Sequence, residues 1–423
     1  MRRIVLMVTV TLFFLSGCTP TNPIESPTPV AQVEDQQENT PTMTPFFEST
    51  DTPQVEQEST EEVPVPIIKP IPQCNVGEEG CVPEVSVLRL TDNSVSDRFP
   101  EIDGDYVVWL SGNGEDANIF LYQISNDKTT LVTDDALDIT TPQIHGDHIV
   151  WKGREDEDWE IYLYQISTGI TTQITENEAI DASPKVDGDF VVWEGYEDGD
   201  PEIYLYQISI GMTTQVSNNE VDDVFPKING DHVLWVEIDE DGVDKELYLY
   251  QISTGKSIQV TKNMRMVWWF PEISGDFLIW ERSEDGEDDQ LYLYQISSGK
   301  HLQLTNNSSG YPQINGDYVV WSDEDLEINL YQISTGVTLQ LTNDKEHDIW
   351  PQVSDDYIVW MNDVFGSGDE VFFYQISSGM TAKLLIHWVD YPQFRISGNY
   401  VVWQEEAEGS LEIFLATINT DVP

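Results

Sequence analysis

The feature that most constrains this chain is a repeat of about 42 residues. Tryptophans that end "VVW"-like stretches recur along it, and the seven intervals between Trp109 and Trp403 average 42 residues. Each unit reads Pro-x-Ile-x-Gly-Asp-x-Val-Val-Trp, an acidic loop, a "LYLYQIS"-like stretch, a turn, and "TTQIT" or "LQLT". Stretches rich in β-branched and aromatic residues between turn residues predict four short strands per unit. Such a unit is typical of a β-propeller blade.

The number of copies predicts how many blades there are. The first three strands of the unit occur eight times, but no fourth strand follows the last copy, which ends at Asn419. A matching "LRLT" stretch instead lies in residues 85–92, ahead of the first copy. We therefore predict an all-β fold: an eight-bladed β-propeller of four-stranded antiparallel blades over residues 85–423. In this arrangement the N-terminal strand completes the last blade and leaves no open edge.

The repeat also resembles a known family. The unit "P-x-I-x-G-D-x-V-V-W … E-I-Y-L-Y-Q-I-S-T-G-x-x-x-Q-I-T" is similar to the TolB-like propeller repeats, including those of bacterial surface proteins. The similarity extends over residues 85–423. It implies a propeller that serves as a binding platform, and it does not identify a ligand.

The N-terminus has the pattern of a processing signal. Arg2 and Arg3 precede an apolar run over residues 4–15, which is short for a membrane span and typical of a signal peptide. The following "LSGC" resembles the lipobox of bacterial lipoproteins, in which the cysteine is acylated, for example with palmitate, and becomes the mature N-terminus. We expect residues 1–17 to be removed and Cys18 to carry the anchor. The protein would then be extracytoplasmic, on the outer membrane if the source has one.

Residues 18–84 are rich in Pro, Thr and Glu, a composition that buries too little apolar area to offset the entropy of ordering. We expect a disordered stalk between the anchor and the propeller. Cys74 and Cys81 lie near its end. Thiols oxidise outside the cytoplasm, and the intervening Gly-containing residues can turn back, so we predict a small disulfide between them.

The charge of the chain limits its partners. It has 77 acidic and 19 basic residues and a net charge of -58. Like charges repel, so nucleic acid is excluded as a main partner, and membrane contact is expected through the lipid anchor alone. Proteins, peptides or polysaccharides of the cell envelope fit better, and we expect a monomer.

The loops between the second and third strands are strongly acidic and vary among copies, as function-bearing loops often do. Three interpretations apply: solvated turn surface, calcium binding, or a surface for a basic protein. Calcium prefers several oxygens at flexible spacing, which Asp239, Asp241 and Asp244 offer. No loop matches the complete EF-hand pattern.

The connections between blades carry a second group of candidate ligand-binding residues. An aromatic residue precedes the proline of the unit in six copies: Phe99, Phe225, Phe270, Tyr311, Trp350 and Tyr391. An aspartate lies three residues before the proline in four copies: Asp97, Asp181, Asp223 and Asp348. Because first strands line a propeller's channel, both groups should surround its mouth. The aromatics either staple neighbouring blades or form a platform for sugars or peptides. Trp268 and Trp269 lie outside the repeat pattern and are further candidates.

Catalytic motifs do not emerge from the sequence. It contains no G-x-S-x-G elbow, H-E-x-x-H pair or Walker loop. Carboxylate pairs for glycoside hydrolysis exist among so many acids, yet nothing singles one out. We interpret the chain as a cell-surface lipoprotein whose propeller binds protein, peptide or glycan, with a possible calcium requirement and no other cofactor. The alternative is an extracytoplasmic hydrolase or other enzyme with acidic residues at the channel mouth.

Overall fold

The computed structural model describes residues 73–75 and most of 84–419. The exceptions within the second range are 114–116, 134–137, 155–157, 198, 240–241, 243–244, 263–270, 283–288, 308, 345, 364–369 and 385–393. Contacts between residues divide the chain into two units, 1–61 and 62–423, and every described residue belongs to the second. Cys18, Cys81, Phe270, Tyr391, Trp268, Trp269, Asp241 and Asp244 lie outside the described residues.

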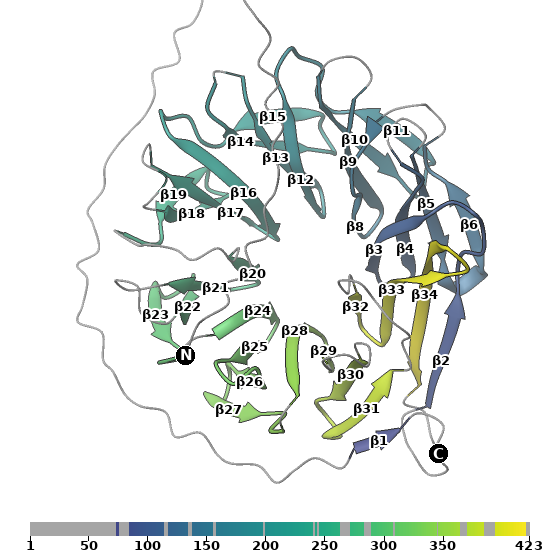
Figure 1. Ribbon diagram of the computed structural model, residues 1–423. Coiled ribbons are helices and arrows are strands. Elements are labelled where there is room, and N and C mark those ends of the chain that lie inside the picture. Colours follow the sequence, from purple (N-terminus) through teal and green to yellow (C-terminus); the bar gives the residue numbers. More distant parts are fainter. Residues whose placement is uncertain are drawn as a thin grey trace, which may run out of the picture. The chain divides into compact units, whose positions relative to one another are not determined.

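The described residues form eight sheets arranged around a central axis, with the first strand of each sheet innermost (Figure 1). The prediction of an eight-bladed, all-β propeller is confirmed. The first four blades contain β3 (Asp97–Asp103), β4 (Tyr106–Ser111), β5 (Asn118–Gln123) and β6 (Lys128–Leu131); β7 (Asp138–Ile139) with β8 (Gln143–His145), β9 (His148–Arg154), β10 (Glu160–Gln165) and β11 (Ile170–Gln173); β12 (Asp181–Asp187), β13 (Phe190–Gly195), β14 (Glu202–Gln207) and β15 (Met212–Gln215); and β16 (Asp222–Asn229), β17 (His232–Ile238), β18 (Lys245–Gln251) and β19 (Lys256–Gln259).

The other four blades follow the same order. They contain β20 (Glu272–Ser274), β21 (Phe277–Arg282), β22 (Gln290–Gln295) and β23 (Lys300–Gln303); β24 (Ser309–Asn315), β25 (Tyr318–Asp323), β26 (Ile328–Gln332) and β27 (Val337–Gln340); β28 (His347–Ser354), β29 (Tyr357–Asp363), β30 (Glu370–Gln375) and β31 (Met380–Leu384); and β32 (Arg395–Ser397), β33 (Tyr400–Ala407) and β34 (Ser410–Asn419) with β2 (Glu84–Arg89). The described part of the chain has one 3-10 turn, η2 (Ile124–Asn126), and no helix there is long and apolar enough to cross a membrane.

Two strands come from the N-terminal side of the repeats. β2 pairs antiparallel with β34, so that residues 84–89 are the fourth strand of the sheet that holds β32 and β33. β1 (Gln73–Asn75) pairs parallel with β31 as a fifth strand of the seventh blade. The sequence assigns residues 73–75 to the stalk, and their short pairing was not expected. The predicted disulfide of Cys74 remains a prediction.

The repeated tryptophans form the core between the sheets. Seven of them stack on the aromatic residue opposite them in the third strand, with ring centroids 5.6 to 5.9 Å apart. Trp193, for example, also belongs to a buried cluster with Val150 and Ile161 of the preceding blade. Aromatic pairs add about 0.5–1.5 kcal/mol beyond their burial. Each blade is therefore stabilised by contacts on both of its faces.

The "QIS" of each repeat has a structural role at one end of the propeller. Asp189, in the turn between β12 and β13, accepts hydrogen bonds from Ser209 N (2.8 Å), Ser209 Oγ (2.6 Å) and Gln207 Nε2 (2.9 Å). These bonds join the turn between the first two strands to the turn between the last two. We call this end the turn face and its residues the turn aspartates: Asp105, Asp147, Asp189, Asp231, Asp276, Asp317 and Asp356.

Candidate functional site

The opposite end, which we call the junction face, carries the connections between blades. There the residue before the proline of the first strand has a left-handed backbone in five blades: Phe99 (φ 54), Ser183 (φ 55), Phe225 (φ 57), Tyr311 (φ 57) and Trp350 (φ 54). The strand register shifts at each of these positions, as in a β-bulge. A left-handed conformation costs an L-residue about 1–2 kcal/mol and is rare for bulky side chains. Bulges redirect side chains and are frequent near binding sites.

Contacts from the preceding blade hold these bulges in place. The backbone N–H of Phe225 donates to Glu194 Oε1 (2.7 Å), and that of Phe99 donates to Gln404 Oε1 (2.8 Å). Neighbouring aromatics also touch, since the rings of Tyr311 and Trp350 meet edge to face at 5.6 Å. Phe225 nevertheless keeps 39% of its surface exposed. The described aromatics of this group therefore lie at blade contacts, and Phe225 keeps part of its surface available to a ligand.

The predicted aspartates of the connections have a different environment. Asp97, Asp181, Asp223 and Asp348 are 0 to 2% exposed, and each Oδ1 accepts a hydrogen bond from the indole of its own blade, at 2.7 to 3.2 Å. The second blade has Ile139 at this position, and its Trp151 Nε1 is buried without a hydrogen bond. The structure thus assigns these aspartates to the support of the core tryptophan.

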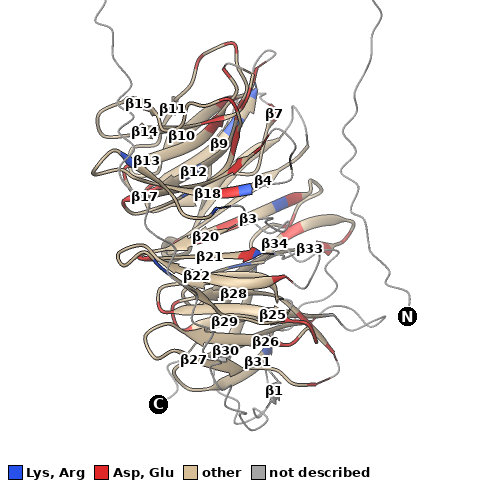
Figure 2. Ribbon diagram, turned by 90° about the vertical axis from the view of Figure 1, so that its left-hand side faces the viewer, with Lys and Arg blue, Asp and Glu red and all other residues tan. Residues whose placement is uncertain are grey.

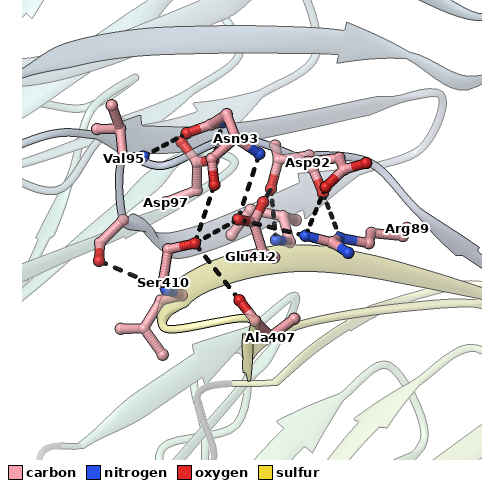
Figure 3. A network of polar contacts seen from close by, with 12 residues as sticks. Arg89, Asp92, Asn93, Val95, Asp97, Ala407, Ser410 and Glu412 are labelled. Atoms are coloured by element: carbon pink, nitrogen blue, oxygen red, sulfur yellow. Dashed lines mark hydrogen bonds and ion pairs between the residues drawn. The ribbon is translucent and has the colours of Figure 1, made fainter.

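The same aspartates take part in a network between blades, shown in Figure 3 for the last and first blades. Asn93 Nδ2 donates to Asp97 Oδ2 (2.8 Å), and Thr91 Oγ1 donates to Glu412 Oε2 (2.6 Å). Asn93 N reaches Glu412 Oε1 at 3.4 Å. We call such a set of Glu, Ser or Thr, Asn and Asp a blade junction. It recurs around Asn177 and around Asn219.

Burial at the junction face changes proton affinities. It raises the pKa of Asp181 to about 6 and that of Asp223 to about 7, although the indole and hydroxyl donors oppose the change. It also raises the pKa of Glu281 to about 8, with only Ser309 Oγ (2.7 Å) as a strong donor. Glu281 Oε2 is buried without a hydrogen bond. Ionisation of these carboxyl groups at neutral pH therefore destabilises the fold.

One junction brings three carboxylates together. Glu327, Asp344 and Asp348 each offer an oxygen within 4.8 Å of the other two, the arrangement of a possible metal centre. The sequence did not lead us to this cluster; the predicted calcium residues include Asp239, whose partners Asp241 and Asp244 lie outside the described residues. The available signal was Asp344 itself, since Asn93, Asn177 and Asn219 occupy the same place in other repeats.

A ring of polar side chains on the innermost strands was also missed. The innermost strand of each blade carries one of what we call the axial residues, which in the five bulged blades lies two residues after the bulge: Glu101, Gln143, Lys185, Lys227, Glu272, Gln313, Gln352 and Arg395. Two ion pairs form within the ring, Lys227 with Glu272 (2.8 Å) and Arg395 with Glu101 (3.0 Å). The ring therefore holds three of the 19 basic residues of a protein that is otherwise strongly acidic (Figure 2).

Lys185 differs from the other two basic axial residues. Its Nζ donates to the neutral Gln143 Oε1 (2.9 Å), and no carboxylate among the described residues lies within ion-pair distance. Burial, together with the charges of Lys227 and Arg395, lowers its pKa to about 8, while Glu101 and Glu272 oppose the change. Residues from β3, β16, β20 and β32 thus act on one ammonium group. The charged side chains of the ring therefore all influence Lys185.

Comparison with known proteins supports the fold. No protein-family model and no curated protein matches this chain. Among solved structures, a computationally designed protein, Ika8, has a TM-score of 0.54 at 14% identity, with 77% of this chain and 98% of that chain covered. A prolyl endopeptidase has a TM-score of 0.54 at 11% identity (78% of this chain, 55% of that chain), and a puromycin hydrolase mutant has 0.50 at 11% (73% and 58%).

These similarities are limited to the fold, because the sequence identities are very low. This chain spans 55% and 58% of the lengths of the two hydrolases. The comparison therefore supports the fold alone, and the function rests on the residues of the site.

Proposed function

We propose that this chain is a lipid-anchored cell-surface protein whose TolB-like propeller binds a peptide or glycan that carries a carboxylate. The observation that carries the proposal is Lys185: an axial ammonium group without a carboxylate partner, in a chain of net charge -58. A charge held in a partly desolvated position is more stable when another group completes the pair. A ligand carboxylate would supply it.

The axial ring favours an anion at its centre. Three of its side chains are basic and two are acidic, so the ring is positive by one charge when all five are ionised. Attraction between charges is stronger in a partly desolvated site than in water. Because Lys185 has a pKa of about 8, it is mostly protonated at pH 7, and a bound carboxylate would raise this pKa further.

The bulged aromatics supply the second part of the binding surface. Phe99, Phe225, Tyr311 and Trp350 stand two residues before axial positions of their own strands. Their rings offer apolar faces that suit sugars or peptide side chains. A ligand that places its carboxylate at Lys185 would meet these rings at the junction face. Variable acidic loops at the same end would discourage ligands with dispersed negative charge.

Binding measurements with paired ligands test the proposal. The full chain in detergent would be titrated by calorimetry with uronic-acid oligosaccharides and their neutral counterparts, and with acidic and amidated peptides. We expect binding of one acidic class, and a loss of at least about tenfold, or 1.4 kcal/mol, in Lys185→Gln. Lys256→Gln on the exposed outer strand β19 makes the same charge change and should bind normally. Equal binding by Lys185→Gln, or tighter binding of neutral ligands, would contradict the proposal.

The anchor is tested separately. Cells that produce the full chain would be fed labelled palmitate and fractionated. We expect label in the membrane-bound protein and none in Cys18→Ser, which should lose membrane association. Label in the Cys18→Ser variant would contradict anchoring at this residue.

A further inference from the structure

The junction between the sixth and seventh blades differs in one residue from the junctions around Asn93, Asn177 and Asn219. At the junctions that contain Asn93, Asn177 and Asn219, an asparagine amide donates to the buried aspartate of the next blade, at 2.8 to 3.0 Å. Between β27 and β28 this place is taken by Asp344, and the aspartate of the next blade is Asp348. A donor is therefore replaced by a third carboxylate.

The junction also lacks a hydrogen-bond donor at a second carboxylate, that of Glu327. Glu327 Oε1 accepts from the backbone N–H of Asp344 (2.9 Å), as its equivalents do. Its Oε2 is buried and has no hydrogen-bond partner, and Glu327 as a whole is only 4% exposed. The hydroxyl of Thr342 lies close enough to favour ionisation of Glu327 and Asp348, but it makes no hydrogen bond of standard geometry to this Oε2.

The other oxygens of the cluster are arranged around the same space. Asp348 Oδ1 already accepts from Trp360 Nε1 (2.9 Å) and Asn362 Nδ2 (2.8 Å), and Asp344 Oδ1 accepts from the backbone N–H of Glu346 (2.8 Å). Each of the three carboxylates therefore has one oxygen held by the protein and a second to offer. Among the described residues no Lys, Arg or His forms a salt bridge with the cluster.

Three carboxylates in this position repel one another unless a positive charge joins them. Coulomb repulsion at such separations is several times stronger in a desolvated site than in water. Burial raises the pKa of Glu327 and of Asp348, and the charge of Asp344 adds to the rise in both. The junctions with asparagine avoid this repulsion, so the presence of Asp344 requires a physical reason. A bound cation would supply it.

We propose that Glu327, Asp344 and Asp348 form a calcium-binding site between the sixth and seventh blades. Hard oxygen ligands suit calcium, and the three carboxylates each offer an oxygen within 4.8 Å of the other two, close enough to share one ion. Asp344 is exposed, which allows water to complete the coordination. The site is independent of the ligand proposed for Lys185.

Terbium luminescence and thermal unfolding of the full chain test this site. Terbium replaces calcium at oxygen sites and is excited by a nearby indole, and Trp360 donates directly to Asp348. We expect sensitised emission from the wild type that calcium displaces, and a calcium-specific rise in the unfolding temperature compared with sodium chloride of equal ionic strength. In Asp344→Asn, the apparent affinity for the ion obtained from either measurement should fall by at least tenfold.

The chain offers a matched control and a clear way to contradict the proposal. Asp344→Asn restores the residue of the other junctions, so it should fold and should unfold in chelator at the same or a higher temperature than the wild type. Glu346→Gln removes the same charge from an exposed neighbour outside the cluster and should bind calcium normally. Unchanged calcium binding in Asp344→Asn, equal loss in Glu346→Gln, or no binding by the wild type at millimolar calcium would overturn the site.

Discussion

The turn face and the junction face of this propeller use the same residue in opposite ways. On the turn face, Asp189 accepts three hydrogen bonds near solvent, and these bonds outweigh its slight burial and lower its pKa. On the junction face, Asp223 accepts from Trp235 (2.7 Å) and Asn219 (2.8 Å), yet burial raises its pKa to about 7. Burial, more than the number of donors, decides whether an aspartate is stabilised as an anion.

The difference also separates the part of each repeat that builds the fold from the part that is free to vary. Turn aspartates and their Gln and Ser partners recur in seven blades with little change. The junction face instead contains left-handed aromatics, the unpaired indoles of Trp151 and Trp280, and the unpaired Oε2 atoms of Glu281 and Glu327. Departures from local consistency of this kind tend to mark functional sites.

The largest expected effect uses pH to separate the two faces. The pKa of Glu281 is raised from 4.5 to about 8 by burial, so the folded protein holds a proton that the unfolded chain releases. The contribution of Glu281 to the free energy of unfolding is therefore fully present below pH 4.5 and is lost as the pH rises to about 8. Asp181 and Asp223 act in the same direction. Between pH 5 and pH 9 we expect the wild type to lose on the order of 4 kcal/mol of its free energy of unfolding through Glu281, and Glu281→Gln not to show this loss.

Denaturant unfolding at several pH values measures this effect. Glu220→Gln, an exposed residue of the same charge, controls for the general repulsion of an acidic protein. The turn aspartates give the opposite pH dependence. Their pKa values are lowered, so their ionised forms stabilise the fold above pH 4, and this stability is lost as the pH falls further. Parallel pH profiles of Glu281→Gln and the wild type would show that Glu281 does not determine the junction face's response.

The sequence predicted the fold because the information is local and repeated eight times. Strand patterns, glycine turns and buried tryptophans each reappear about every 42 residues, so one irregular copy does not obscure the rest. The role of Asp97 and its equivalents was less accessible. The constant interval of 12 residues between Asp97 and Trp109, or Asp223 and Trp235, was a signal for their contact. Their expected position at the channel mouth instead suggested a role in ligand binding.

The site depends on contacts that no single repeat contains. Lys185 occupies the variable position of Pro-x-Ile, where Gln, Glu, Lys and Arg all occur, and it gains meaning only when the inner strands face one another. The carboxylates of Glu327 and Asp348 likewise come from different blades. Comparison of repeat with repeat would have shown that Asp344 stands where Asn93, Asn177 and Asn219 stand, but the consequence depends on the closed arrangement of the blades.

A smaller effect sharpens the comparison at single residues. Asp223→Ala removes two hydrogen bonds and leaves the buried indole N–H of Trp235 unpaired, for which we expect a loss of about 1–3 kcal/mol in the free energy of unfolding. Asp189→Ala removes three hydrogen bonds, but their donors lie near solvent and can bond to water. We expect this change to cost less than about 1.5 kcal/mol. Urea unfolding at pH 6 compares the two variants.

The outcome depends on which quantity governs the cost of losing an aspartate. If hydrogen-bond number decides, Asp189→Ala will be the more damaging variant, and the contrast between the faces will fail. If burial decides, Asp223→Asn will recover much of the loss, because its amide oxygen still accepts from Trp235. The corresponding Asp189→Asn should gain little over alanine, since water already satisfies the exposed donors. The ratio of the two recoveries therefore measures how much of the junction's stability lies in one buried acceptor.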